Sequence, residues 1–364
     1  MISARLDIAA LSEGQQVDEV YLLIKKQLAS TKGGKPYGAL RLGDASGEIE
    51  AKLWDQAGEL LAPLAPGQAV RVSGRVQAYN GQMQMVLSSL ASEPGADAAQ
   101  FLPRSPCDPG ELWQRLAEVK QAVKNSQLQR LLRAFFGNQE LRRAFELAPA
   151  AKAAHHAYVH GLLEHTVSVA GLARLAAGHY PHLDGDLLLT GALLHDIGKV
   201  EELTLGPPLD YTDAGRLEGH LVLGARMLDA RLAGLKGFPA SAAAHLRHMI
   251  LSHHGTEEFG SPVKPKTAEA LVLHAVDDLD AKTMMIRQVI ETQGSGEVRW
   301  SNFNRLLERH VFTGPSPWDE AEPLAISPAS RTAADDPEAE AARRAKRCSP
   351  TPTLFDARSP EESD

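Results

Sequence analysis

The first part of the chain alternates apolar and polar residues with the period of two that is typical of β-strands. The clearest case is residues 49–54, where Ile49, Ala51 and Leu53 alternate with Glu50, Lys52 and Trp54, and the runs 20–26, 37–42, 69–76 and 82–87 also read as strands. Asn80 and Gly81 separate the last two runs, and both tolerate the positive φ angles of a two-residue hairpin. A helical pattern at 55–64 separates the third run from the fourth. We therefore predict five short strands with a helix after the third.

The second part of the chain places leucine, valine and phenylalanine at three-and-four spacing, which is the pattern of amphipathic helices. We predict helices at residues 111–124, 127–136, 139–147, 160–178, 187–195, 222–232, 241–252, 267–291 and 300–311. Beyond about residue 315 proline, serine, alanine and mixed charges dominate, and they supply too few apolar side chains to build a core. This part is therefore expected to be all-α, with a disordered end.

These patterns predict a multi-domain protein. Five strands with a helix after the third form the layout of an OB-fold barrel, a small all-β domain. The expected divisions are an OB-fold at 1–95, a breaker-rich linker at 96–110, an all-α domain at 111–314 and a disordered tail at 315–364. Leu354 and Phe355 form an apolar island in the tail. They are a candidate for protein docking, with a chance pair of hydrophobic residues as the alternative.

Charge and composition exclude several classes of protein. The 364 residues carry a formal net charge of −8, which argues against a protein that coats duplex nucleic acid but allows a local basic groove. No apolar run approaches the roughly 20 residues that span a bilayer, and no signal-peptide core follows Met1, so we expect a cytoplasmic protein without membrane contact. Cys107 and Cys348 are far apart and lack CxxC spacing. Any metal site must therefore use nitrogen and oxygen ligands.

Candidate chemistry centres on residues 193–199, Leu-Leu-His-Asp-Ile-Gly-Lys. His195 and Asp196 can both turn toward one cation, because adjacent helical positions lie only about 100° apart around the axis. We expect Gly198 to stop the helix and Lys199 to return toward the site. Taken alone, the pair is also compatible with a histidine capped by an aspartate in a helical core.

Further metal-seeking side chains fall within or beside apolar helical patterns. They are His165, His220, His253, His254 and Asp277. Burial of this many polar groups without partners would cost roughly several kcal/mol each, and a shared cation removes that cost. The set therefore favours a metal centre over a purely structural cluster.

The order His165, His195-Asp196, Asp277 resembles that of the HD-domain metal-dependent phosphohydrolases. The additional His220 and His253-His254 are similar to the two-metal versions of that domain. Two longer strings, His-His-Ala-Tyr at 155–158 before Gly-Leu-Leu-Glu-His-Thr, and Leu-Ser-His-His-Gly at 251–255 before Gly-Ser-Pro-Val, resemble those of the YhaM-type 3'-to-5' exoribonucleases. The resemblance covers roughly residues 10–310.

This resemblance implies a ligand set for two divalent cations. It assigns one ion to His165, His195, Asp196 and Asp277. Asp196 would bridge to a second ion, which the resemblance assigns to His220 and His253, with His254 nearby. Manganese is the expected metal, although hard oxygen and borderline nitrogen ligands also suit iron, magnesium and zinc.

Catalytic roles also follow from the resemblance. Two cations bridged by Asp196 would supply a polarised water as nucleophile and a clamp for the phosphoryl oxygens during attack. Lys199 is expected to neutralise charge on the attacked phosphate, with a salt bridge at the helix end as its alternative role. His155 and His156 are candidates for contact with the substrate phosphate, and simple packing is the alternative for both.

The barrel offers candidates for single-strand binding, in which bases stack on aromatic rings and the backbone follows lysines and arginines. They are Lys25, Lys26, Lys32, Lys35, Tyr37, Arg41, Trp54, Arg75 and Tyr79. Structural roles compete with this reading, because Trp54 can cap the barrel core and exposed lysines are common on edge strands.

The leading functional hypothesis is a metal-dependent exoribonuclease that shortens single-stranded RNA from the 3' end, with single-stranded DNA as a second candidate substrate. The polarity comes only from the resemblance. One alternative is a phosphohydrolase of free nucleotides or cyclic dinucleotides with a regulatory OB-fold. Another is a non-catalytic single-strand-binding protein with a vestigial metal site.

Overall fold

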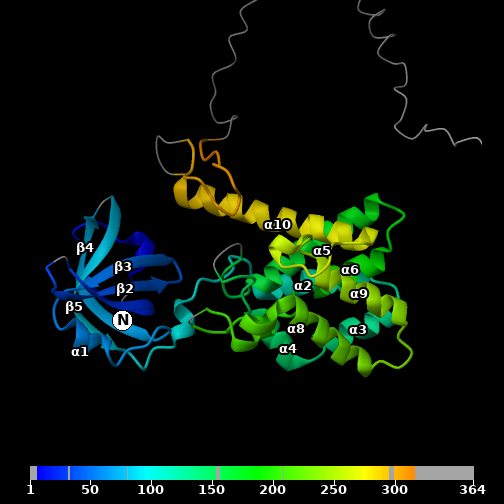
Figure 1. Ribbon diagram of the computed structural model, residues 1–364, viewed down its shortest axis with the longest axis horizontal. Helices are drawn as coiled ribbons and strands as arrows, with labels where there is room; N and C mark the ends of the chain where they lie inside the picture. The colour runs from blue at the N-terminus through cyan, green and yellow to red at the C-terminus, as the bar shows by residue number, and fades with distance from the viewer. Residues whose placement is uncertain are drawn as a thin grey trace, which may run out of the picture. The chain divides into compact units, whose positions relative to one another are not determined.

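The computed structural model describes residues 6–31, 33–79, 81–152, 156–207, 209–294 and 299–315 (Figure 1). Its first part is a closed barrel of five strands in the order β1-β2-β3-β5-β4. The strands are β1 Gln16–Ser30, β2 Pro36–Asp44, β3 Gly47–Leu53, β4 Ala69–Tyr79 and β5 Gln82–Ser92. The neighbouring pairs that the structure describes are antiparallel, except for β3 and β5, which run parallel. The helix α1, Ala57–Leu61, follows the third strand, so the OB-fold prediction is confirmed.

The alternation in the sequence decides which side chains fill the barrel. Leu40 and Leu53 are buried, whereas Arg41 and Lys52 point outward from the same strands. The Lys26 ammonium donates to the backbone carbonyl oxygen of Leu61 at 2.6 Å and also to that of Leu64. It thereby satisfies the carbonyl of Leu61 at the C-terminal end of α1 and that of Leu64 in the turn that follows.

The second part of the described chain is all-α, as predicted. Its helices are α2 Pro109–Ala122, α3 Ser126–Phe136, α4 Gln139–Leu147, α5 Gly161–His179, α6 Gly185–Leu194, α7 Lys199–Glu202, α8 Asp213–Ala233, α9 Ala240–Ser252 and α10 Ala268–Gln293. Several begin where a side chain accepts a hydrogen bond from a backbone N–H of the first turn. Asp108 does so for α2, Asn125 for α3 and Asp184 for α6.

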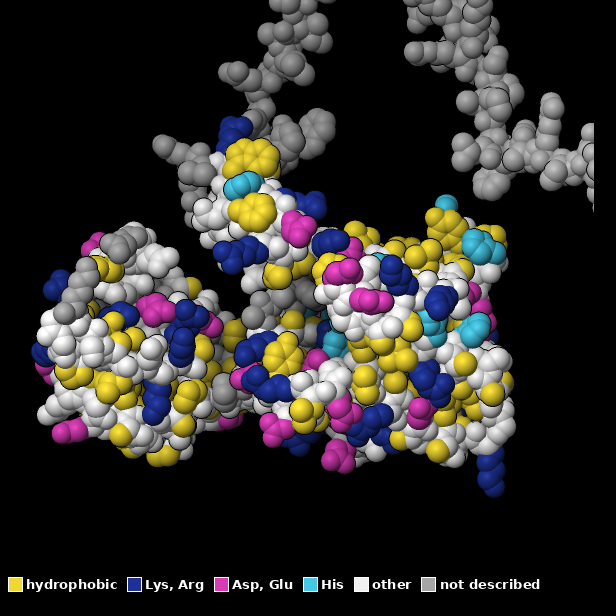
Figure 2. Space-filling model, in the orientation of Figure 1, with side chains coloured by type: hydrophobic (Ala, Val, Ile, Leu, Met, Phe, Trp, Pro, Cys, Tyr) yellow, Lys and Arg dark blue, Asp and Glu magenta, His cyan; other side chains and the backbone are white. Residues whose placement is uncertain are grey.

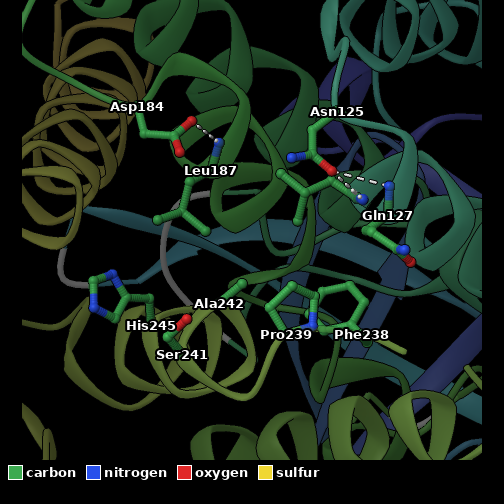
Figure 3. Close-up of a pocket in the computed structure, with 10 residues that line it drawn as sticks. Asn125, Gln127, Asp184, Leu187, Phe238, Pro239, Ser241, Ala242 and His245 are labelled. Carbon is green, nitrogen blue, oxygen red and sulfur yellow. Dashed lines mark hydrogen bonds between the residues drawn. The ribbon is translucent and has the colours of Figure 1, made fainter. Parts of the chain in front are cut away.

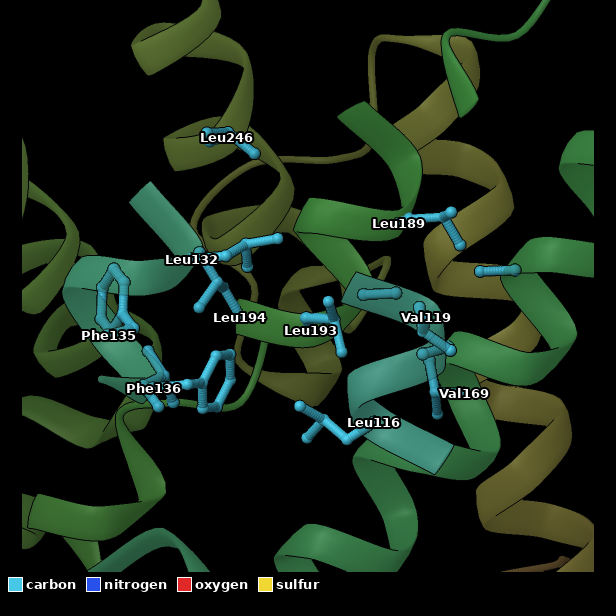
Figure 4. Close-up of a cluster of buried hydrophobic side chains, with 14 of the residues drawn as sticks. Leu116, Val119, Leu132, Phe135, Phe136, Val169, Leu189, Leu193, Leu194 and Leu246 are labelled. Atoms are coloured by element: carbon cyan, nitrogen blue, oxygen red, sulfur yellow. The ribbon is translucent and has the colours of Figure 1, made fainter. Parts of the chain in front are cut away.

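The core of the helical part surrounds α6 (Figure 4). Every residue of α6 from Leu187 to Leu194 is buried, and Leu193 and Leu194 join the same apolar cluster as Phe135 and Leu246. Because α6 runs through the middle of this cluster, the residues that follow it, His195 and Asp196, are delivered to the interior rather than to the surface.

The predicted helix at 300–311 is wrong. Residues 299–315 instead form a hairpin in which Trp300 pairs with Phe312 and Asn304 pairs with Arg309. The side chain of Asn304 accepts hydrogen bonds from the backbone N–H groups of Leu306 and Leu307, both at 3.0 Å. Such local bonds compete with helix formation, and the apolar spacing of this segment does not reveal them.

The predicted helix at 222–232 is only the second half of α8, which starts at Asp213 and is interrupted at Gly219 by φ 73° and ψ 157°. The predicted hairpin between β4 and β5 agrees with the ends of those strands and with φ 77° at Gly81, while Asn80 lies outside the described residues. The predicted docking residues Leu354 and Phe355 also lie outside them, as does the tail from 316 onward.

Replacement of Lys26 by alanine should destabilise the barrel by roughly 1.5 kcal/mol, because it removes a charged donor from two backbone carbonyls. Lys25→Ala is the matched control, since the neighbouring side chain is exposed, and it should change stability by less than about 0.5 kcal/mol. Urea unfolding, followed by hydrogen exchange of barrel amides, measures both changes. Equal stability of the two variants would contradict the structural role of Lys26.

Candidate metal centre

The site begins at the turn that follows α6. His195 is fully buried there, and its Nδ1 lies 2.8 Å from the carbonyl oxygen of Ala192. The expectation that Gly198 stops the helix is wrong, because α6 ends at Leu194 and Gly198 has the right-handed φ of −65°. Gly198 is needed for close packing: a Cβ there would lie 2.1 Å from the carbonyl oxygen of His220. The absence of a side chain lets α8 bring His220 to the site.

One group of donor atoms comes from α5, from the turn after α6 and from α10. His165 Nε2 lies 3.2 Å from His195 Nε2, 3.4 Å from Asp196 Oδ2 and 3.1 Å from Asp277 Oδ1. His195 Nε2 lies 3.4 Å from Asp196 Oδ2 and 3.7 Å from Asp277 Oδ1. Ligands at about 2.1 Å from one ion are about 3.0–3.4 Å apart at octahedral or tetrahedral angles. The four side chains are therefore spaced for a single cation.

A second group adjoins the first through the other oxygen of Asp196. Asp196 Oδ1 lies 3.4 Å from His220 Nε2 and 3.4 Å from His253 Nε2. His254 Nε2 lies 3.2 Å from His220 Nε2. Among the described residues, buried Asp196 Oδ1 and His253 Nε2 have no hydrogen-bond partner. Unpaired buried polar atoms are rare and costly, so this pair of atoms indicates a site for a cation.

Each histidine of the cluster is oriented through its other ring nitrogen. The acceptors of the Nδ1 atoms are Asp280 for His165 at 2.8 Å, Ala192 for His195 at 2.8 Å, Glu202 for His220 at 2.9 Å, Ile250 for His253 at 2.8 Å and Phe259 for His254 at 2.7 Å. A carbonyl or a carboxylate only accepts, so Nδ1 carries a proton, and Nε2 of the neutral ring has the lone pair that a metal needs. The residues present therefore fit two ions.

Lys199 lies against the shared carboxylate. Its Nζ is 2.7 Å from Asp196 Oδ2, so it forms the predicted salt bridge, while its predicted contact with a phosphate is untested. Burial lowers the pKa of Lys199, but the charge of Asp196, the hydrogen bond to it and the charges of Asp277 and Glu202 together outweigh burial and raise that pKa above its ordinary value. Lys199 is therefore a buried cation beside the metal-ligand candidates.

The carboxylates and histidines also shift one another's pKa values. Burial alone would lower the pKa of His165, but hydrogen bonds to Asp196, Asp277 and Asp280 hold it well above 6.5. Burial alone would raise the pKa of Asp277, but the hydrogen bond to His165 and the charge of His195 lower it. Burial, with His253 and His220 beside it, lowers the pKa of His254 to about 3. His254 is consequently a neutral ligand candidate near neutral pH.

Two acidic residues orient the histidines that are candidate metal ligands. Asp280 Oδ2 lies 2.8 Å from His165 Nδ1, and Asp280 Oδ1 accepts a hydrogen bond from Ser168. Glu202 Oε1 accepts from both the backbone N–H of His220 at 3.0 Å and its Nδ1 at 2.9 Å. In the sequence, Asp280 and Lys282 resemble the family's Leu-Asp-Ala-Lys string, which left three roles open for Asp280: support of a metal ligand, an ion pair or contact with substrate. The structure places it behind His165. Glu202 gave no signal, because its contact with His220 depends on the break in α8 at Gly219.

The other histidine candidates have different outcomes. His156 is buried, with Nε2 3.3 Å from Asp280 Oδ2 and Nδ1 2.8 Å from the hydroxyl oxygen of Tyr158. It therefore packs behind His165, and its predicted phosphate contact is untested. His155 lies outside the described residues.

The candidates on the barrel fall into two groups. Tyr37 and Trp54 lie together on the outer surface with ring centroids 4.9 Å apart, and the Lys52 ammonium lies 5.6 Å from the Tyr37 centroid. Lys52 is a residue that the sequence reasoning missed, although its position between Glu50 and Trp54 already marked it as outward-facing. Lys25 and Tyr79 are also exposed.

The remaining basic candidates have protein partners. Arg41 pairs with Glu50 at 2.9 Å, Lys35 lies 3.4 Å from Asp55, and Arg75 donates to the carbonyl oxygen of Gly14 at 3.2 Å. Lys26 holds the end of α1, as described above. Lys32 lies outside the described residues. RNA contact by these residues is an untested prediction, and Lys26 has the strongest competing structural role.

A separate pocket of about 210 Å³ lies between the starts of α3, α6 and α9 (Figure 3). Asp184, Leu187, Pro239 and His245 are among its lining residues, and Asp184 accepts a hydrogen bond from the backbone N–H of Leu187. None of the metal-ligand candidates lines it. The pocket is therefore distinct from the metal centre.

The fold and the site define a two-part class of protein, an OB-fold barrel followed by an HD-type metal-binding helical domain. The HD domain family matches residues 162–282, and the OB-fold nucleic acid binding domain family matches residues 23–91. The chain belongs to the YhaM family of 3'-5' exoribonucleases. It is 39% identical over 310 residues to YhaM of Bacillus subtilis, which covers 83% of this chain and 96% of that one. With YhaM of Oceanobacillus iheyensis it is 35% identical, covering 80% and 92%.

Solved structures that resemble parts of the chain are more distant. The HD domain of the Listeria monocytogenes phosphodiesterase PgpH is 19% identical, covers 42% of this chain and 80% of that one, and has a TM-score of 0.28. The second OB-fold domain of replication protein A from Methanococcus maripaludis is 19% identical, covers 24% and 94%, and has a TM-score of 0.21. In the described part of the chain, no helix has both the length and the apolar character to cross a membrane.

Asp196→Asn should release at least one of two bound ions and lower RNA hydrolysis by roughly 100-fold or more, because one carboxylate serves both donor groups. RNA binding without hydrolysis should change less than about twofold, because the barrel is unaltered. Metal content after dialysis, an end-labelled RNA assay and fluorescence anisotropy give the three measurements. Asp229→Asn, at an exposed acid of α8, is the control. Two retained ions with near-normal activity would contradict a shared ligand.

Asp280→Asn should lower metal affinity by roughly 10- to 100-fold, because it weakens the acceptor that orients His165. Extra metal should then restore much of the activity. Asp278→Asn is the matched control two positions earlier, where the carboxylate pairs with Lys282 at 2.7 Å on the surface. Metal titrations of both variants test the difference, and equal affinities would exclude an orienting role for Asp280.

Proposed function

We propose that the chain is a metal-dependent exoribonuclease that hydrolyses the phosphodiester bonds of single-stranded RNA from the 3' end. The observation that carries this proposal is the position of Asp196, whose two oxygens face two separate groups of nitrogen and oxygen donors. Membership in the YhaM family supports the polarity and the choice of RNA. Single-stranded DNA is a further candidate substrate.

The metal ligands are proposed to be the ones deduced above. His165, His195, Asp196 and Asp277 would hold one ion, and Asp196, His220 and His253, with His254 nearby, would hold the other. Two divalent cations, when bound, turn a water into a strong nucleophile and offset charge on the phosphoryl oxygens. A donor set without sulfur suits manganese, which we favour, and also iron, magnesium or zinc.

The protein's own groups supply orientation and charge. Asp280 and Glu202 fix the rings of His165 and His220, so the donor atoms are in place before substrate arrives. Lys199 is a buried cation beside Asp196, and it is proposed to stabilise negative charge on the attacked phosphate. Asp196 and Lys199 are thus the proposed catalytic residues.

The barrel is proposed to hold the single strand. Tyr37 and Trp54 provide stacked aromatic rings on the outer face, and Lys52 adds a positive charge beside them. In this division of labour residues 1–95 bind the strand, 96–110 link the domains and 111–314 cleave. Binding remote from the reacting phosphate helps long substrates more than short ones.

A 20-nucleotide RNA labelled at its 5' end should give a ladder that shortens progressively, and the same RNA labelled at its 3' end should release labelled mononucleotide at once. Manganese should support the reaction and EDTA should stop it. Faster turnover of free nucleotides or cyclic dinucleotides than of oligomers would favour the phosphohydrolase alternative. Absence of any turnover in metal-loaded protein would favour a non-catalytic binding protein.

Tyr37→Ala combined with Trp54→Ala should weaken binding of the 20-mer by roughly tenfold or more, because each stacked base contributes about 1–3 kcal/mol. Hydrolysis of a dinucleotide should fall far less. Tyr180→Ala, at an exposed tyrosine after α5, is the control. An equal loss on both lengths would mean that the barrel is structural or regulatory rather than a substrate clamp.

A further inference from the structure

The hairpin at residues 299–315, called here the C-terminal hairpin, lies beyond the residues that match the HD domain family. Its two arms are joined by backbone hydrogen bonds from Ser301 to Val311 at 2.8 Å and from Thr313 to Arg299 at 2.9 Å. Leu307 and Val311 pack against Val289 near the end of α10. The hairpin is therefore fixed to the same helix that carries Asp277.

The C-terminal hairpin has one buried and one exposed face. Ser301, Val311 and Thr313 are buried, whereas their neighbours Trp300 and Phe312 are 58% and 41% exposed. The Trp300 and Phe312 rings lie against each other with centroids 5.4 Å apart. Phe303 is also exposed, with its ring 5.5 Å from that of His310. Figure 2 shows apolar side chains beside basic and histidine side chains over the end of α10.

The C-terminal hairpin is also basic. Residues 299–315 contain three arginines and one glutamate, a formal charge of +2, although the whole chain carries −8. Arg305 and Arg309 make no ion pair with any residue that the structure describes. Exposed aromatic rings interleaved with arginines suit a polyanion with flat bases, because the rings stack on bases and the guanidinium groups pair with phosphates. The positive charge of the hairpin therefore favours single-stranded nucleic acid, rather than an apolar protein surface, as its binding partner.

We propose that the C-terminal hairpin is a second binding site for single-stranded RNA. Bases stack on Trp300, Phe303 and Phe312, and Arg305 and Arg309 contact the phosphates. The choice of RNA rests on the proposed function. Val289 follows Asp277 by 12 residues of continuous helix, which places the hairpin about 18 Å along α10 from that ligand. A dinucleotide at the metal centre does not reach so far, so the hairpin contributes only to longer substrates.

The test measures binding of a fluorescein-labelled 20-mer RNA to the full chain in EDTA, where no hydrolysis occurs. Trp300→Ala should weaken binding about tenfold, and Trp300→Phe should restore most of it, because phenylalanine still stacks. Arg305→Ala should reduce the slope of log affinity against log salt by about 0.7, whereas Trp300→Ala should leave the slope unchanged. Leu217→Ala and Arg143→Ala, at exposed positions of α8 and α4, are the matched controls.

The outcomes separate this site from the proposed function. Unchanged 20-mer affinity in Trp300→Ala and Arg305→Ala would overturn the hairpin site whether or not the protein cleaves RNA. A change in oligomeric state with unchanged affinity would instead identify a contact between copies of the chain and also overturn it. Absence of hydrolysis in metal-loaded wild type, with the expected binding losses intact, would contradict the exoribonuclease activity alone. An equal loss on a dinucleotide and on the 20-mer would show that the hairpin only stabilises α10.

Discussion

The structure depends on one buried carboxylate, that of Asp196. Its side chain is 2% exposed, and a charge withdrawn from water to this degree must be compensated nearby. Lys199 offsets part of the charge through Oδ2, while Oδ1 faces two histidines with no hydrogen-bond partner in the described part of the chain. A cation bound between these groups would satisfy both unpaired atoms. The charges and the donor atoms of this cluster therefore point to cation binding, independently of any relative.

The fold makes such a centre possible because many elements share in compensating the buried polar and charged groups. The donors come from α5, the turn after α6, α8, the end of α9 and α10, and each ring is oriented by an acceptor outside the cluster. Some of these acceptors are carbonyl oxygens near helix ends, where backbone groups lack helical partners. A carbonyl oxygen near a helix end accepts a hydrogen bond from Nδ1 of a candidate ligand histidine, as Ala192 does from His195. The orientation of the candidate ligand rings therefore depends on where the helices end.

An acidic protein that acts on a polyanion needs local rather than global attraction. Its formal charge of −8 disfavours nonspecific coating of nucleic acid, so affinity must come from short surfaces where rings and basic groups lie together. The outer face around Tyr37 and Trp54 and the C-terminal hairpin share this composition. Both stand apart in sequence from the candidate metal ligands, so, if both bind RNA as proposed, substitutions there would change length selectivity without disturbing the chemistry.

The sequence by itself determined the period of two in the barrel, the period of 3.6 in the helices and the metal-seeking set around His195 and Asp196. These features depend on local periodicity and residue chemistry, and both can be read directly from the order of residues. Only the tertiary structure decided that Gly198 serves close packing, that Gly219 breaks α8 and that Glu202 therefore reaches His220. It also turned a helix-like pattern at 300–311 into a hairpin, because side chains such as Asn304 bond the backbone locally. The sequence shows no periodic pattern for contacts between residues far apart in the chain. It shows none for the competition between local hydrogen bonds either.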